Sequence, residues 1–577
     1  MTDPAGGAPT PAPPAWVGCV DPRADGPITR THHRVGLLTE PVRAALGAAA
    51  RPVPWRELCR RLGEATASAL LADGWLFDLP AWATRPRTTP RPTGAVLLVA
   101  SRGRPELLSR LLEHLVHQPA RLPLAVCLDG SPTQVRASLR VLGASPLDVR
   151  VSTPASRAMA ASRVAACVGL PDAALAFGLA AGWPGANDPV RTGGARNALL
   201  LFAGARAAAF IDDDIQPIGQ VQAWRPRWAH PADVFRNEPV SLAEATARAT
   251  QGIDLREVTA PLGLSPAKLL DLGPKAPLWT SASAATLRCV TARRAPRIRL
   301  TSAGLLGDEG TSGTLHRLFL SSPLDELLRD DPSAWPQLRS SRSAARTAGH
   351  GALGPSHPWM TALAGVDPSG GWAPFLPAGR GSDATFASTL HHLHDDTVCA
   401  SLPMMALHLP PPRQVPDAGP VGDVLSIHLN ELVQRALRRL TAHAHHTPAD
   451  RLHQLGHATL ATLGPNPTSL QRAWHDLQRH RDASLLVSLH ALAERGPASP
   501  GWRRDVRSAT DLLEAALDAA QPRPPVDLRR SEHPWPSAYN TLHTWATLCL
   551  AWPEVQRHAN GLDDAFQSPS AALKALG

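Results

Sequence analysis

The sequence predicts an α/β fold: a doubly wound, mostly parallel sheet, preceded by a small helical unit and followed by an all-α domain. Short apolar runs at Ala95–Ala100, Leu124–Leu128 and Ala207–Ile211 alternate with segments of helical period. Such runs are typical of strands that are buried on both faces of a parallel sheet. From Gly422 onward the apolar residues recur only at helical spacing. The 577 residues are enough for several domains, at roughly 100–200 residues each.

The N-terminal part is predicted to be a separate helical unit. Residues 1–15 are rich in Pro, Ala and Gly, and we expect them to be disordered. Residues 16–83 contain helical patterns at Glu40–Ala50, Pro54–Leu62 and Glu64–Gly74, followed by a short apolar strand. This order is winged-helix-like, and either a structural appendage or a peptide- or DNA-binding module is compatible with it. The Pro- and Arg-rich segment 84–93 marks the next domain boundary.

The central domain is predicted to span residues 94–413. A helix starts at Pro105, and a further strand is expected at Leu147–Val151. Small residues fill the stretch 155–190, to which the pattern assigns no element. Further along, 297–314 reads as a strand followed by a Gly-rich acidic loop, 323–350 as helical, and Ala384–His394 as a helix before a short strand. The third domain, 422–577, is predicted to hold helices near 449–463, 467–495, 503–520 and 537–559.

Composition restricts the classes of partner and the compartment. The formal charge of +9 is spread along the chain, which favours anionic partners such as nucleotide phosphates but predicts no nucleic-acid-binding stripe. The seven cysteines are widely spaced and include no C-x-x-C pair, so neither a disulfide framework nor a zinc knuckle is expected, and a cytoplasmic location fits. No segment reads as a clean transmembrane span, although peripheral membrane contact stays open.

Acidic residues follow two of the predicted strands. Asp129 follows Leu124–Leu128, and Asp212, Asp213 and Asp214 follow Ala207–Ile211. In doubly wound sheets, ligands bind at the carboxyl ends of the strands. Three consecutive carboxylates repel one another, so a compensating cation is expected beside them. Oxygen ligands of this kind suit Mn²⁺ or Mg²⁺, which usually take substrate phosphates as their remaining ligands.

Four segments in order resemble the nucleotide-sugar domain of family-two, GT-A-type glycosyltransferases. They are AVLLVASRGRPELLSRLLEHL, LAVCLDGS, GGARNALLLFAGA and the strand that ends in the acidic triplet. The resemblance covers about residues 94–217 and extends more weakly to about 413. It implies a GT-A-like fold and the metal-dependent, inverting transfer of a sugar from a nucleoside diphosphate-sugar to an acceptor hydroxyl.

The resemblance also implies roles for particular residues. It assigns Asp129 to the nucleoside base, and Ser101 and Arg102 to the loop near the base and ribose. Arg196 and Asn197 match the pair beside the nucleotide, and Asp212 and Asp213 are assigned to donor binding. Asp214 is implied as the main metal ligand, with Asp212 and His408 completing the set around Mn²⁺ or Mg²⁺. The sugar, the nucleotide and the acceptor, whether glycan, lipid, peptide or small molecule, are not specified.

The acceptor half resembles the family less closely. In GRGSDATF, Asp383 matches the position of the general base, but Ser382 stands where the family pattern has Glu. Asp308 and Glu309, in GLLGDEGTSG, are competing candidates for the base. Two other functions stay open. One is a nucleotidyltransferase, although SRGRP lacks the lysine expected of its pyrophosphate loop; the other is a degenerate domain that binds without catalysis.

Overall fold

The fold is described by a computed structural model of the whole chain. From residue 91 onward it describes residues 91–119, 121–183, 191–228, 234–269, 296–310, 315–320, 322–354, 359–411, 419–440, 446–495, 499–519, 521–529 and 531–576. Before residue 91 it describes residues 16–19, 28–30, 35–37, 42, 53–72 and 76–78. Outside these ranges lie the predicted tail 1–15, nearly all of the predicted helix at Glu40–Ala50, and most of the boundary segment 84–93.

The centre of the protein is a mixed sheet with a parallel core. Its core strands are ordered β8 (Val149–Ser152), β7 (Leu124–Leu128), β6 (Ala95–Ser101) and β9 (Ala207–Ile211), and neighbouring strands are parallel. Strand β17 (Leu363–Val366) is antiparallel to β9. Beyond it lie β14 (Arg297–Asp308) and β18 (Thr397–His408), which again run in the direction of β9. The predicted α/β class and the mostly parallel centre of the sheet are confirmed.

Successive residues of a strand face opposite sides of the sheet. In the core strands both sides are buried, as is usual for parallel sheets. Val96 and Leu98 of β6 belong to one hydrophobic core, whereas Leu97 and Val99 belong to the other. Helices α5 (Pro105–Val116) and α6 (Pro132–Ala144) cover the second face. The first face is covered by α7 (Pro154–Val168), α8 (Asp172–Gly178) and α9 (Thr192–Ala203).

Two regions differ from the sequence-based expectation. The stretch 155–190 contains α7 and α8. The buried face of α7 is made mostly of small or polar residues, with Val164 as its one large aliphatic side chain, so it gives little hydrophobic periodicity, and α8 buries only Leu175 and Gly178. The stretch 323–350 is only partly helical: α13 (Ser322–Asp330) and α14 (Trp335–Ser340) precede a strand, β15 (Ser343–Thr347). β15 is a strand because it pairs with β14 on one side and with β12 (Arg236–Pro239) on the other.

Four further strands extend the sheet beyond β18 and β14, and two short helices lie among them in sequence. They are the strands β10 (Ile215–Val221), β11 (Arg227–Trp228), β13 (Gln251–Gly252) and β16 (Ala352–Gly354), with the short helices α10 (Leu242–Arg248) and α11 (Arg256–Thr259). β10 is antiparallel to β18, and Ile215 lies opposite His408. This pairing places the residue after the acidic triplet beside the last residue of β18.

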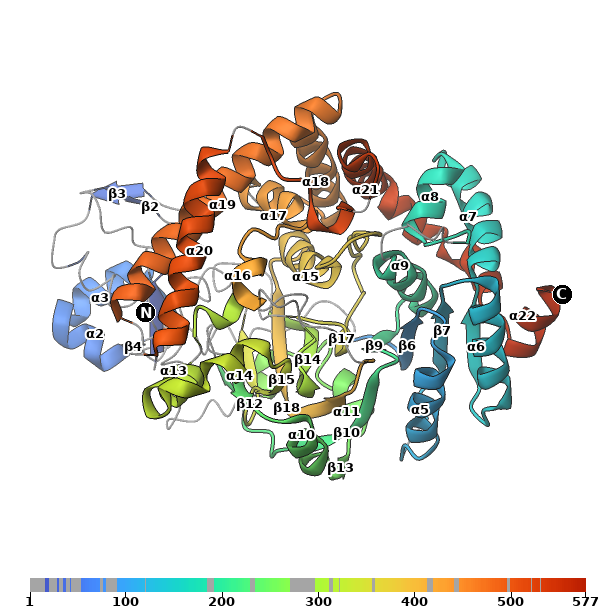
Figure 1. Cartoon of the computed structure of the whole chain (residues 1–577), viewed down its shortest axis with the longest axis horizontal. Coiled ribbons are helices and arrows are strands. Elements are labelled where there is room, and N and C mark those ends of the chain that lie inside the picture. The colour runs from blue at the N-terminus through green and yellow to red at the C-terminus, as the bar shows by residue number, and fades with distance from the viewer. Residues whose placement is uncertain are drawn as a thin grey trace, which may run out of the picture.

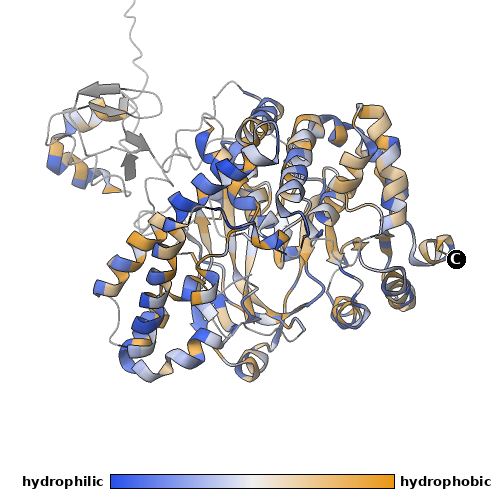
Figure 2. Ribbon diagram, turned by 45° about the horizontal axis from the view of Figure 1, so that its top comes forward, coloured by the Kyte–Doolittle hydropathy of each residue, from blue (hydrophilic) through white to orange (hydrophobic). Residues whose placement is uncertain are grey.

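The helical C-terminal region is confirmed. It consists of α16 (Gly419–Asp423), α17 (Asn430–Arg439), α18 (Pro448–Leu463), α19 (Pro467–Arg495), α20 (Pro500–Asp518), α21 (Pro534–Arg557) and α22 (Pro569–Ala575). These helices have hydrophobic residues on some sides and hydrophilic residues on others (Figure 2). No helix in the described segments combines the length and apolar character needed to cross a membrane.

The C-terminal helices share one hydrophobic core with the first face of the sheet. Trp545 and Trp552 of α21 lie in the same core as Leu199 of α9 and Phe375, and Trp545 Nε1 donates to Pro374 O at 3.0 Å. The end of the chain crosses to the opposite side of the molecule, where α22 lies beside α6 (Figure 1). There the backbone of Gln567 pairs with Val151 of β8. The C-terminal region is therefore integrated into the sheet's packing.

The N-terminal unit contains two of the three helices expected from its pattern, and nearly all of the third, Glu40–Ala50, lies outside the described residues. The two are α2 (Trp55–Leu62) and α3 (Glu64–Ala72), which bury Trp55, Leu58, Ala67 and Leu70 together. The predicted short strand is β5 (Leu76–Asp78), and it joins β1 (Trp16–Cys19) and β4 (Val53–Pro54) in an antiparallel sheet. A hairpin of β2 (Ile28–Arg30) and β3 (Val35–Leu37) lies between them in sequence. The winged-helix assignment stays a prediction.

A buried ion pair joins β14 to the residue before β18. Arg299 donates to both carboxylate oxygens of Asp396, at 3.0 and 3.2 Å, and both side chains are almost fully buried. Replacing Asp396 with Asn leaves the buried guanidinium without its counter-charge. We expect Asp396→Asn to lower the free energy of unfolding by about 3–5 kcal/mol in urea denaturation at pH 7.

The pH dependence of this stabilisation has a definite sign. Burial alone would raise the pKa of Asp396, but Arg299 more than offsets it and holds the pKa below its usual value. The pair's contribution is therefore fully present above about pH 4, the usual pKa of an unfolded Asp, and is lost as pH falls through the folded-state value. The control is Asp325→Asn, which removes an exposed pair with Arg329 and should cost at most about 0.5 kcal/mol. Equal losses in the two variants would contradict the prediction.

Candidate functional site

The candidate site lies at the edge of the sheet where the carboxyl ends of parallel strands meet. β6 ends at Ser101, β9 is followed by Asp212–Asp214, β14 ends at Asp308 and β18 ends at His408. The triplet forms a tight turn into β10, in which Ile215 N donates to Asp212 O at 3.1 Å. This is the edge at which doubly wound sheets bind their ligands.

Asp213 is the most enclosed member of the triplet, with 1% of its surface exposed. Ser101 Oγ donates to Asp213 Oδ2 at 2.6 Å. Arg104 Nε donates to the same oxygen at 3.1 Å, and Arg104 Nη2 pairs with Oδ1. Both carboxylate oxygens are thus engaged by the loop that follows β6. This arrangement holds the turn against the first strand.

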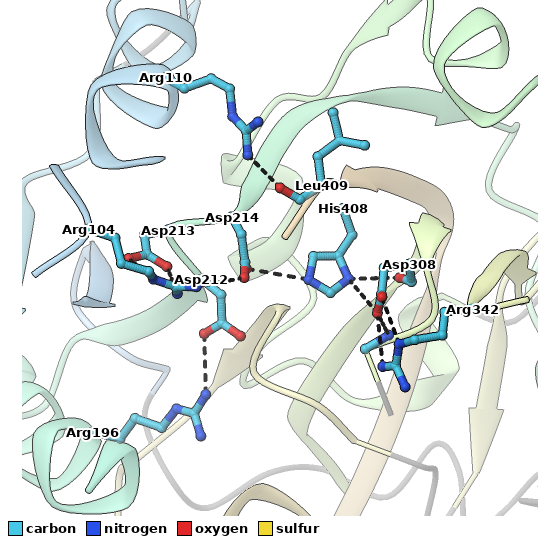
Figure 3. Close-up of polar contacts among 11 residues, drawn as sticks. Arg104, Arg110, Arg196, Asp212, Asp213, Asp214, Asp308, Arg342, His408 and Leu409 are labelled. Carbon is cyan, nitrogen blue, oxygen red and sulfur yellow. Dashed lines mark hydrogen bonds and ion pairs between the residues drawn. The ribbon is translucent and has the colours of Figure 1, made fainter. Parts of the chain in front are cut away.

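Asp214 joins that loop to the end of β18. Its Oδ1 lies 3.4 Å from His408 Nε2, and its Oδ2 accepts from Arg104 Nη1 at 3.2 Å (Figure 3). The backbone reinforces the contact, because Leu409 N donates to Asp214 O at 3.0 Å. Arg110 of α5 in turn donates to Leu409 O at 2.7 Å. The acidic turn and the end of β18 therefore form one connected unit.

His408 is oriented by the end of β14. Its Nδ1 lies 2.7 Å from Asp308 O, which makes Nδ1 the donor and directs Nε2 toward Asp214. Arg342 binds the Asp308 carboxylate through Nε at 3.0 Å and Nη2 at 3.3 Å. Figure 3 shows this chain of contacts running from Asp214 through His408 to Asp308 and Arg342.

The two other acidic residues of the site are each paired with an arginine from the start of α9. Arg196 Nη2 donates to Asp212 Oδ1 at 3.2 Å. Arg191 Nη2 donates to Asp129 Oδ1 at 2.6 Å and also to Gly182 O at 3.0 Å. One helix start thus connects the carboxylate that follows β7 with the first carboxylate that follows β9.

The pKa shifts reflect a competition between burial and counter-charges. Burial raises the pKa of Asp213 to about 6, although Arg104 opposes the shift. Burial also raises the pKa of Asp212, against the charge of Arg196. For Arg104 and His408, burial acts to lower the pKa, but the neighbouring carboxylates more than offset it and both values are raised. The site therefore stabilises the protonated, positively charged forms of Arg104 and His408 beside its carboxylates.

Two of the predicted donor-binding residues, Ser101 and Asn197, make hydrogen bonds within the fold. Ser101 is buried against Asp213, and Arg102 is exposed on the loop after β6. Asn197 is fully buried: its Nδ2 donates to Gly178 O and Phe375 O, and its Oδ1 accepts from Phe375 N. All its hydrogen-bonding groups are used within the fold, so the structure gives Asn197 a role in packing α9. Its assignment to the donor gains no support from these contacts.

Asp383 lies in the first turn of α15 (Ser382–Leu393), which Gly381 caps with a φ of 71°. Its Oδ1 accepts from Ala384 N at 2.9 Å, and no described cation lies within ion-pairing distance of it. The competing candidates are bound more tightly. Asp308 is held by Arg342, and Glu309 is paired with Arg317 and His316 at 3.2 Å each.

Two of the three candidate bases, Glu309 and Asp383, act electrostatically on Arg346 of β15. Burial lowers the pKa of Arg346 to about 10, and the charges of Glu309 and Asp383 both act against that shift. The guanidinium stacks over the Phe235 ring, 4.4 Å from its centroid. Arg346 therefore lies within electrostatic reach of both carboxylates.

The residues fit a divalent ion in part. Among the described residues, no group of three or more His, Cys, Asp or Glu side chains is arranged to hold a metal. Asp214 Oδ1 and His408 Nε2 nevertheless face each other, and the contact of His408 Nδ1 with Asp308 O is the usual orientation of a metal-binding histidine. Two protein ligands suffice where substrate phosphates supply others. Asp212, the third predicted ligand, turns toward Arg196 instead (Figure 3).

Sequence reasoning missed the arginines that neutralise the site. Arg104, Arg191 and Arg342 each bind a site carboxylate, yet none was among the predicted site residues. Arg104 could have been suspected, because it directly precedes Pro105 in the loop after the first strand. Arg342 offers no such signal, since it reaches Asp308 only through the pairing of β14 with β15.

Comparison with models of known protein families and with curated proteins finds no match to this chain.

Close packing at the start of α9 positions Arg196, and Gly193 is central to it. A Cβ added at Gly193 would lie 1.9 Å from Leu376 O, so the backbone would have to move. We expect Gly193→Ala to lower the free energy of unfolding by about 1–3 kcal/mol in urea denaturation. The control is Gly252→Ala, because a Cβ there meets nothing within 4 Å and should leave stability within about 0.5 kcal/mol. A Gly193→Ala variant as stable as this control would refute the close approach.

Proposed function

We propose that this protein transfers a sugar from a nucleoside diphosphate-sugar to an acceptor hydroxyl, with a GT-A-like arrangement of its sheet. The observation that carries the proposal is the meeting of the acidic triplet, Asp129 and His408 at the carboxyl ends of β9, β7 and β18. The order of the core strands and the contact between Asp214 and His408 support it. The location of the site agrees with the edge at which such sheets bind nucleotides.

The chemistry is a single displacement at the anomeric carbon of the sugar. The acceptor oxygen forms a bond to that carbon while the bond to the diphosphate breaks, and the nucleoside diphosphate leaves with the electron pair. A Mn²⁺ or Mg²⁺ ion, held by Asp214 and His408, would stabilise the charge that develops on the diphosphate. Asp308 keeps His408 oriented for this role.

Asp383 is the best candidate for the general base. A base must be free to accept the proton of the acceptor hydroxyl, and proton transfer of this kind contributes roughly 10²–10⁴-fold to the rate. Glu309 is 3% exposed and held by Arg317, and Asp308 is held by Arg342. Asp383 is half-buried and accepts only a backbone N–H in the described structure.

A non-catalytic nucleotide-binding role is the second candidate. It is favoured by the pairing of each triplet carboxylate with Arg104 or Arg196, because these two arginines supply counter-charge without a metal. Ser382, in place of the acidic residue of the family pattern, also favours it. Turnover of a donor separates the two functions, because both predict nucleotide binding and only one predicts catalysis.

The first test is donor binding and hydrolysis. The protein is titrated calorimetrically with UDP and GDP in Mn²⁺ and in EDTA, and is screened for hydrolysis of common nucleotide sugars. We expect metal-dependent binding and turnover, and we expect Asp214→Asn to reduce turnover by about 10²–10³-fold. Asp325→Asn, an exposed change in α13, should behave as wild type. Metal-independent binding without turnover would instead support the non-catalytic role, and no nucleotide binding at all would contradict both.

The second test concerns the base. With a donor and acceptor pair identified by that screen, Asp383→Asn should lower kcat by about 10²–10⁴-fold while leaving the Kd for the nucleotide within twofold. Asp172→Asn removes a carboxylate from the first turn of another helix, α8, and serves as the matched control. If Asp383→Asn transfers the sugar at nearly the wild-type rate, Asp383 is not the general base, and the role is assigned to Asp308 or Glu309.

A further inference from the structure

The loop that leads into α15 is held by the C-terminal helical region. Asp527 lies in the 3₁₀ turn Val526–Leu528, far from this loop in sequence. Its Oδ1 accepts from Arg380 N at 2.8 Å, and its Oδ2 accepts from Leu429 N at 2.9 Å. One carboxylate therefore ties together three segments: the loop before α15, the turn before α17 and the 3₁₀ turn.

Asp527 is ionised and almost fully buried in this position. Its side chain is 3% exposed, and His428 Nδ1 lies 3.1 Å from Oδ1. Burial alone would raise the pKa of Asp527, but His428 and the two backbone N–H groups more than offset it, and the pKa is lowered. A carboxylate with this many donors has one favoured position. It can therefore fix the position of the loop that it binds.

Two glycines allow the C-terminal region to approach the loop closely. Gly379 has a φ of 93°, and a Cβ there would lie 3.3 Å from Asp527 Cγ. Gly381 has a φ of 71°, and a Cβ there would lie 2.4 Å from Asn430 Nδ2. Asn430 Nδ2 also donates to Gly381 O at 3.3 Å. Both glycines have left-handed backbone conformations, which residues with a side chain rarely adopt. A side chain at either position would also crowd Asp527 or Asn430.

The same contacts continue into the first turns of α15. Gln434 of α17 donates to Ala384 O at 3.4 Å and to Ser388 Oγ at 3.1 Å. Asp383 lies between Gly381 and Ala384, both of which are bound by α17. The backbone that carries the Asp383 carboxylate is therefore held from the C-terminal region on both sides.

We infer that Asp527, together with Asn430, is a positioning residue for Asp383, so that the C-terminal helices form part of the acceptor half of the active site. The inference rests on the proposed function, since it assigns these residues a role through the candidate base. Asp527 does not touch the substrate in this scheme. Its effect is on the geometry of proton transfer, where a displacement of about 1 Å can cost roughly 10²-fold.

The test is a double-mutant cycle on donor turnover. UDP-glucose, UDP-N-acetylglucosamine and GDP-mannose are assayed for hydrolysis with Mn²⁺, and the fastest is used. Asp527→Asn should lower kcat roughly 10- to 100-fold and leave the Kd for the nucleotide within twofold. Added to Asp383→Asn, it should cause no further loss, because the group it positions is already absent. Asp527→Glu, which keeps the charge, should recover part of kcat.

The matched control is Asp482→Asn. Asp482 is a buried carboxylate of α19 that binds Arg523 at 2.7 Å and Arg481 at 3.2 Å. Its removal should lower stability and leave kcat within twofold. If Asp527→Asn lacks a cooperative unfolding transition, Asn430→Ala is used in its place, with the same expected pattern.

The outcomes separate the two claims. If the wild-type protein turns over none of these donors, the proposed function is contradicted, and the inference fails with it. If it turns over a donor but Asp527→Asn keeps the wild-type kcat, the inference is overturned and the proposed function stands. The inference is also overturned if the losses from Asp527→Asn and Asp383→Asn multiply, because that result would show that Asp527 acts independently of Asp383.

Discussion

Charge compensation at the end of β9 is the constraint on which the candidate site depends. Three adjacent carboxylates in a largely buried turn are stable only beside positive charge. The fold supplies it through Arg104 from the loop after β6 and Arg196 from α9, and through His408 from the end of β18 when that ring is protonated. These contacts determine which strands and helices must meet at this edge. The same residues therefore join several elements of the fold and form the candidate active site.

The compensation also constrains how a diphosphate and its metal could bind. Asp214 is shared between Arg104 and His408, so a divalent ion bound there would enter a site that already contains a guanidinium. In the proposed function, the arginines of this site would attract the diphosphate and its carboxylate would attract the metal. The pairing of Asp212 with Arg196 leaves the second predicted ligand oriented toward the helix. The residues that balance the charge of the triplet are therefore the same residues that a donor and its metal would contact.

The C-terminal helices contribute to the centre of the protein as well as to its surface. Trp545 and Trp552 pack in the same core as the first face of the sheet, and α22 reaches the far side against α6. The helical region is sequence-distant from the strands, yet it holds the loop before α15 and covers the sheet. Through these contacts, residues beyond 422 help to hold the backbone of the segment that carries Asp383.

Much of the secondary structure could be predicted because its signals are local. The runs that became β7 and β9 were recognised to the residue, and α18 and α19 were placed within one or two residues at each end. Where the signal was weak, prediction failed: the alanine-rich α7 lacks a strong apolar stripe. Likewise β15 is a strand only because β14 and β12 lie on either side of it.

For the site, the amino-acid pattern alone predicts that carboxylates follow two buried strands, because apolar runs and acidic residues can both be read directly from the chain. It also pointed to His408 and Asp383 through the family resemblance. The three-dimensional fold was needed to show that Arg104 and Arg191 pair with those carboxylates, that Arg342 pairs with Asp308, and that Asp527 binds the loop before Asp383. The physical reason is that a charge pair between distant residues depends on strand order and packing, which leave no local pattern in the sequence.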